Sequence, residues 1–238
     1  MIPKKYRIPY CYAMGLRVVA FLISIAFSIC AQEPLRFERK IIQTRTTGCI
    51  ATFEYPEIVT AGSSRARDRI NSGILDVLLR QTDWPSRASG FRSLTAYIDD
   101  FVKDCAALPT RPRQAYVHKG ITIFRYTPPV LSFRCVASED DGGAHPFGTT
   151  FFANFDSSTG KAITMNDLVK EGSLPKLESL ADVHFRGERN LPATESLSER
   201  SYNFPGDRFK LNDNFGIGEE HLVFFQYLRD WSGSDGKY

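Results

Sequence analysis

Hydrophobic residues recur at helical spacing in the first half of this chain. The segment SLTAYIDDFVKDCAAL, which begins at Ser93, carries one apolar stripe of the kind that an amphipathic helix buries, and Ser93 supplies a capping hydroxyl. A second helix is expected to begin at Ser63 and Ser64 and to run through about Gln81. The two stripes consist of Leu94, Tyr97, Ile98, Phe101, Val102 and Cys105, and of Ile70, Ile74, Val77 and Leu78.

Alternating apolar and polar residues predict strands on both sides of these helices. The first strand ends at Tyr55, and after Pro112 the spacing of apolar residues changes to every second residue. A hairpin turn follows the last long strand, and Gly160 in that turn can take a positive φ at little steric cost. KAIT after the turn is expected to return as a short strand. The expected strands are TTGCIATFEY, QAYVHKGITIFRYT, VLSFRCVAS and GTTFFANFD, with Leu131, Phe133, Cys135 and Ala137 on one face of the third.

The C-terminal part predicts one helix and two short strands. Thr164 and Asp167 have the spacing of a capping box, and Gly172 and Pro175 break or bend the helix that follows. Two strands are expected here, one before and one after Gly218. The order of strand, two helices, several strands, helix and strands predicts an α+β fold, an antiparallel sheet with helices packed on one face.

The first 31 residues have the pattern of a secretory signal peptide. Four basic residues precede Val18–Ile29, a run without charge, and Ala31 offers a small residue at the cleavage point. The apolar run is shorter than the roughly 20 residues of a membrane span. We therefore expect cleavage after Ala31 and a periplasmic or secreted protein, with an uncleaved N-terminal anchor facing the periplasm as the alternative.

Removal of the leader changes the charge of the protein. The whole chain has 30 Lys and Arg and 27 Asp and Glu residues. Without the four basic residues of the leader, 26 basic residues (30 minus 4) and 27 acidic residues remain, which gives a formal net charge of −1. No clustered basic face is apparent, so nucleic-acid binding is not expected. Residues 32–238 fit a single domain, with an N-terminal half of about 46–115 and a C-terminal half of about 116–238.

Three cysteines lie outside the leader: Cys49, Cys105 and Cys135. In an oxidising compartment two of them should pair and one is left over. Cys105 lies in the helical apolar stripe and Cys49 on the strand face beside Phe53, so both sulfurs point into one interior. Cys49–Cys105 is therefore the preferred disulfide. Spacing does not decide connectivity, so the other two pairings and three buried thiols stay open.

The segment from Asp140 to Pro146, DDGGAHP, gathers the residues best suited to a site. Adjacent glycines predict a sharp turn and let a ligand approach the main chain, which favours a binding rim. The architectural alternative is a corner whose His-Pro pair holds the next residues extended. The candidate ligand-binding residues are Asp141, Gly142, Gly143 and His145.

No catalytic or metal-binding motif completes this corner. A zinc site needs three or four His, Cys, Asp or Glu ligands, and the sequence has no HExxH, no paired CxxC and no second histidine nearby. His184 and His221 are remote and stand in unrelated contexts. We therefore expect no metal, no cofactor and no catalytic residue. The alternative is a peptidoglycan-directed hydrolase that uses His145 with Asp140 or Asp141.

Several motifs resemble, in order, the RsiV/PdaC-type bacterial extracellular domain of unknown function. The specific part is GGAHP followed by NFDSSTGKAIT and NDL, and the similarity extends over about Thr46–Phe225. In anti-sigma-factor members a domain similar to this one binds lysozyme, and in deacetylase members it accompanies a separate catalytic domain that acts on peptidoglycan. The resemblance therefore implies a binding domain whose partner is a lysozyme-like protein or a cell-wall glycan. It transfers no catalytic residue.

The end of the chain departs from this family pattern. Members continue after the VFF strand to a final strand, whereas here the sequence reads QYLRDWSGSDGKY. A missing last strand would expose a sheet edge, which tends to pair with another chain. An assembly subunit paired through that edge is therefore a third interpretation.

Overall fold

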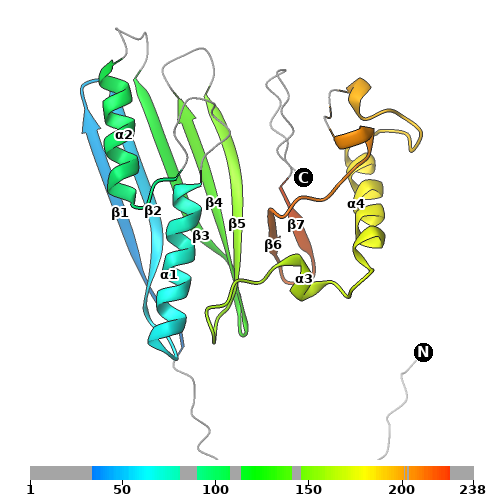
Figure 1. The fold of residues 1–238 in the computed structure, drawn as a ribbon, viewed down its shortest axis with the longest axis horizontal. Helices are drawn as coiled ribbons and strands as arrows, with labels where there is room; N and C mark the ends of the chain where they lie inside the picture. The colour runs from blue at the N-terminus through cyan, green and yellow to red at the C-terminus, as the bar shows by residue number, and fades with distance from the viewer. Residues whose placement is uncertain are drawn as a thin grey trace, which may run out of the picture. The chain divides into compact units, whose positions relative to one another are not determined.

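Five long strands form the main sheet, and two helices lie along it (Figure 1). The computed structural model describes residues 34–80, 90–107, 114–140, 146–200, 202 and 204–225. The spatial order of the strands follows the chain, and all neighbours are antiparallel except β2 and β3, which are parallel because two helices connect them. The strands are β1 (Arg36–Thr46), β2 (Cys49–Thr60), β3 (Ala115–Thr127), β4 (Val130–Asp140) and β5 (Phe147–Asp156).

Both predicted helices are confirmed, together with their capping residues. Helix α1 spans Ser64–Leu79 and α2 spans Leu94–Ala107. Ser63 Oγ accepts a hydrogen bond of 3.1 Å from the Ala66 amide, and Ser93 Oγ accepts one of 3.1 Å from the Ala96 amide. The apolar stripes face the sheet and form the main core with Phe53, Val117, Leu131 and Phe133.

Helix α1 approaches β5 closely at one glycine. A Cβ atom on Gly73 would lie 2.4 Å from Cζ of Phe155, so any side chain there would push the helix away from the strand. Gly160, in the turn after β5, has φ +68°, and a Cβ on it would lie 2.5 Å from the carbonyl oxygen of Ala66. The two glycines let α1 pack on β5 and on the turn that follows it.

The disulfide joins Cys49 and Cys105, as the sequence favours. It connects the start of β2 to the last turn of α2, with the two Cα atoms 6.3 Å apart. Cys135 is a free thiol in the core. Burial raises the pKa of the Cys135 thiol to about 12, so it stays protonated at neutral pH and behaves as a core residue.

A short hairpin covers part of the opposite face of the sheet. It consists of β6 (Phe215–Ile217) and β7 (Leu222–Phe224). Asn154 of β5 holds it: its Nδ2 donates to the carbonyl oxygen of Phe215 at 2.7 Å, and its Oδ1 accepts from the amide of Ile217 at 3.2 Å. The α+β fold is thus confirmed, with α1 and α2 on one face and β6 on the other.

The segment between β5 and β6 is less regular than its sequence pattern suggests. KAIT forms a single bridge, Ala162 to Phe155, instead of a strand. The predicted capping box opens only a four-residue helix, α3 (Met165–Leu168), and Gly172 separates it from α4 (Leu174–Arg189). Two single 3-10 turns, η1 (Ser198–Arg200) and η2 (Pro205–Asp207), follow.

The predicted leader, residues 1–31, lies outside the described residues, so its cleavage stays a prediction. In the part of the chain that the structure describes, no helix has both the length and the apolar character needed to cross a membrane.

Candidate functional site

The glycine corner predicted from the sequence lies outside the described residues. Asp141, Gly142, Gly143 and His145 all fall in the segment 141–145 between β4 and β5. Asp140 is described: it is the last residue of β4, lies opposite Tyr116 of β3 and is buried. The role of this corner as a binding rim therefore stays a prediction.

A buried polar cluster lies in the core near the same end of β4. Lys119 is fully buried, and its Nζ donates to the carbonyl oxygens of Leu78 at 3.0 Å and of Arg80 at 2.6 Å. The same Nζ lies 3.8 Å from Oε1 of Glu139, which accepts 2.9 Å from the hydroxyl of Tyr97. Because the ammonium caps the last turn of α1 and no solvent reaches it, the cluster is structural.

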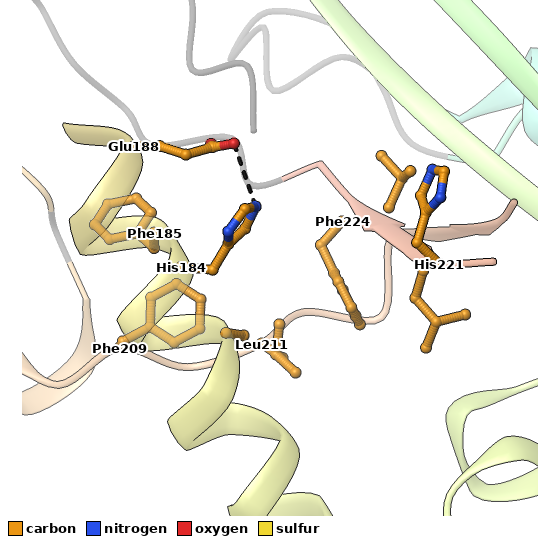
Figure 2. A pocket seen from close by; sticks show the side chains of 10 residues that line it. His184, Phe185, Glu188, Phe209, Leu211, His221 and Phe224 are labelled. Carbon is orange, nitrogen blue, oxygen red and sulfur yellow. Dashed lines mark ion pairs between the residues drawn. The ribbon is translucent and has the colours of Figure 1, made fainter. Parts of the chain in front are cut away.

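A pocket of about 370 Å³ lies between α4 and β7 (Figure 2). Figure 2 shows the rings of Phe185 and Phe209 on the α4 side and that of Phe224 on the β7 side. Most of the lining side chains are apolar, which suits an apolar group of a ligand. The lining residues are Ala181, His184, Phe185, Glu188, Phe209, Leu211, His221, Leu222, Val223 and Phe224.

An aromatic cluster fixes the α4 wall of this pocket. Phe185 is buried, and its ring centroid lies 5.6 Å from that of Phe204 and 5.3 Å from that of Phe209. Arg186 ties the following loop to the helix, because its Nη1 donates to the carbonyl oxygens of Pro192 at 3.0 Å and of Glu195 at 2.8 Å. Contacts within the protein itself therefore hold the α4 wall of the pocket in place.

Two histidines and a carboxylate form the polar part of the lining. His184 Nε2 lies 3.2 Å from Oε1 of Glu188 one helical turn later, as Figure 2 shows. His221 stands on the opposite side, directly before β7. The two histidines are remote from each other in the sequence and stand in unrelated contexts, whereas the structure brings them to one pocket. The helical spacing of Ala181, His184 and Glu188 is the sequence signal that could have placed these three residues together on one wall of a site.

A second hollow, of about 480 Å³, lies between α1 and the segment after β5. Its lining is more polar, with the charged residues Asp76, Arg80 and Asp213 and the amide of Asn166. Across the described residues, no group of three or more His, Cys, Asp or Glu side chains could hold a metal ion. These arrangements suit binding.

No family model and no curated protein matches this chain. Two crystal structures of DUF3298 family proteins share its fold. The one from Bacteroides fragilis has a TM-score of 0.62 and 16% sequence identity, over 80% of this chain and 82% of that one. The one from Pseudomonas aeruginosa PAO1 has a TM-score of 0.59 and 12% identity, over 81% of this chain and 82% of that one. At these identities the similarity establishes the fold alone.

Proposed function

We propose that this protein is an exported, non-catalytic binding domain of the bacterial envelope that recognises a protein partner through the pocket between α4 and β7. The observation that carries the proposal is the apolar lining of a preformed pocket beside a strand. The leader pattern of residues 1–31 and the Cys49–Cys105 disulfide support export, because disulfides persist in oxidising compartments.

The chemistry of the pocket favours a protein over a glycan. Sugars present many hydroxyl groups, and each one that is buried without a hydrogen-bond partner costs free energy. Among the described residues that line the pocket, the polar side chains are those of His184, Glu188 and His221. An apolar anchor side chain of a partner protein gives up no hydrogen bond on entering such a site, and such anchors carry much of the affinity of protein interfaces.

A lysozyme-like protein is the first partner to test, because the resemblance described above points to lysozyme binding in anti-sigma-factor members. The experiment is a calorimetric titration of the protein with a c-type lysozyme, together with co-sedimentation on purified peptidoglycan. We expect lysozyme binding in solution and no enrichment on the glycan. An absence of binding to both would refute the proposal in this form.

Two variants of α4 locate the binding site. Ala181→Phe fills the pocket, whereas Val183→Phe adds the same group at a position that is 70% exposed and does not line the pocket. We expect Ala181→Phe to weaken binding by at least about tenfold and Val183→Phe to leave it unchanged. Circular dichroism of both variants checks that α4 is intact. Equal affinities of the two variants would place the partner elsewhere.

The polar hollow supports a second candidate, a peptidoglycan-binding domain. Carboxylates and an amide suit the hydroxyl and amide groups of a cell-wall polymer, and Asp213 and Asn166 line this hollow. Co-sedimentation with peptidoglycan that is lost in Asp213→Ala but kept in Ala181→Phe would favour this candidate over the protein-binding one.

A further inference from the structure

We infer that the partner is bound as an added strand: an extended segment pairs with the open edge of β7 and places an apolar side chain in the pocket beside α4. This inference rests on the proposed function, because it specifies how that pocket holds a protein. It also specifies the chemistry of the segment, an alternation of apolar residues with basic residues at its ends.

The hydrogen bonds of the hairpin show which edge of β7 is open. The Gly218 amide donates to the carbonyl oxygen of His221 at 2.9 Å, and the Phe225 amide donates to that of Asn214 at 3.0 Å. In an antiparallel pair, main-chain groups alternate between the partner strand and the opposite edge. The main-chain groups of Leu222 and Phe224 therefore point away from β6. Among the described strands, β7 pairs with β6 alone.

This open edge borders the pocket. All three residues of β7, Leu222–Phe224, line it together with the α4 residues Ala181, His184 and Glu188, and no residue of β6 does. The pocket therefore lies on the side of β7 that faces away from β6. An unpaired edge beside an apolar wall has the two elements of recognition by strand addition: main-chain hydrogen bonds give affinity, and a pocket for alternate side chains gives selectivity.

The charges around the edge favour a segment with basic ends. Glu219 and Glu220 form the turn into His221, are exposed, and make no ion pair with a described residue. Among the described residues, Glu188 on the other wall pairs with His184, which is charged only when protonated. Lys210 is exposed and does not line the pocket.

A second copy of this chain does not fit the edge as well. Two copies paired through β7 would each present Leu222 and Phe224, side chains that already form a wall of the pocket, so the pocket would stay unfilled. A separate extended segment with a free apolar side chain fills the pocket and satisfies the edge.

The test uses a phage-displayed library of random nine-residue peptides selected against the full chain. We expect enrichment of peptides with apolar residues at alternate positions and Lys or Arg at the ends. The best peptide is then synthesised with N-methyl groups on alternate amides, in both registers, because N-methylation removes donors without changing the side chains. One register should bind at least about tenfold more weakly and the other should bind normally.

Three controls separate this inference from the proposed function. Binding of the selected peptide should be lost in Ala181→Phe and kept in Val183→Phe. A peptide that needs the pocket but tolerates N-methylation in both registers would overturn strand addition and leave the proposed function standing. Failure to enrich any peptide that distinguishes the two variants would overturn the inference. Displacement of the selected peptide by a synthetic peptide of residues 226–238 would also overturn the inference. So would a sedimentation-velocity experiment in which the selected peptide dissociates a dimer of this protein.

Discussion

At the scale of single residues, Lys119 combines complete burial with an unusually full set of contacts. Its Nζ donates to the carbonyl oxygens of Leu78 in α1 and of the C-cap residue Arg80. The same Nζ lies 3.8 Å from Oε1 of Glu139 and 4.5 Å from the centroid of the Tyr97 ring. We expect Lys119→Met to lower the free energy of unfolding by about 3–5 kcal/mol, because it leaves the Glu139 carboxylate buried without its counter-charge. Urea denaturation measures this loss.

Two further variants test that explanation. Lys119→Met combined with Glu139→Gln removes both charges and should be more stable than Lys119→Met alone. Arg39→Met breaks an ion pair with Glu54 whose side chains are 67% and 36% exposed, so water replaces the contact and stability should hardly change. If the double variant is less stable than the single one, the penalty comes from lost packing and not from the unpaired carboxylate.

The carboxylate of Asp167, at the start of α3, allows a second prediction at the scale of single residues. Hydrogen bonds from the amide and hydroxyl of Thr164, at 2.8 and 2.7 Å, lower the pKa of Asp167 to about 2. Since the folded pKa is below the unfolded one, the stabilisation is present above about pH 4 and is lost as the pH falls through about 2. NMR titration of the Asp167 carboxyl measures the pKa directly.

Asp167→Asn tests the same carboxylate by its effect on stability. The difference in unfolding free energy between wild type and this variant should be largest near neutral pH and should shrink below about pH 4. Glu171→Gln, which removes an exposed carboxylate outside the capping box, is the matched control. A difference that is independent of pH would contradict the assignment.

At the scale of elements, the disulfide holds α2 against β2. Cys49 and Cys105 are 56 residues apart in the sequence, and a cross-link over a loop of this size stabilises a domain by about 4 kcal/mol in the chain-entropy treatment. We expect Cys49→Ala/Cys105→Ala to unfold at a correspondingly lower urea concentration. Wild type in dithiothreitol should match the variant. A transition of the wild type that is insensitive to reductant would contradict the prediction.

How much of each element the sequence reveals depends on whether its partners are local. The stripe of α2 and its cap at Ser93 lie within one helix, so the spacing of apolar residues predicts both, and with them the face that carries Cys105. The pocket depends on Phe185, Phe209 and Phe224, which come from a helix, a loop and a strand. No periodicity connects them. The parallel pairing of β2 and β3 is hidden for the same reason.

Irregular elements show the second limit. RFKLNDN alternates like a strand, but Phe209 and Leu211 line the pocket without pairing. KAIT forms one bridge because the chain turns into the capping box at Thr164. The local pattern predicts which face of a segment is apolar, whereas tertiary contacts decide whether the main chain of that segment joins a sheet.

At the scale of the whole molecule, the side-chain amide of Asn154 is one of the links between the main sheet and the hairpin that forms the pocket wall, and Asn214, which bonds to β5 at Phe152 and Thr150, is another. Asn154 is buried, donates to Phe215 and accepts from Ser132 Oγ at 2.7 Å as well as from the Ile217 amide. Asn154→Ala removes the donor to the Phe215 carbonyl, at a cost of about 1–3 kcal/mol if that buried group stays unsatisfied, whereas the Ile217 amide keeps its 3.3 Å bond to Ser132 Oγ. We expect β6 and β7 to open while the five-stranded sheet stays folded.

Hydrogen exchange measures this effect element by element. In Asn154→Ala the amides of β6 should exchange faster by at least about tenfold while those of β3 and β4 keep their wild-type rates. Ser132→Ala removes the bond from Ser132 Oγ to the same Oδ1 and the 3.3 Å bond from the Ile217 amide to Oγ, but it keeps both Asn154 contacts with β6, so its effect should be smaller. Binding at the pocket should weaken in Asn154→Ala, although Asn154 does not line it, because the β7 wall is positioned through β6. Uniformly faster exchange across β3 and β4 would instead mean that the hairpin and the sheet unfold as one unit, and the pocket would then depend on the whole core and not on this single amide.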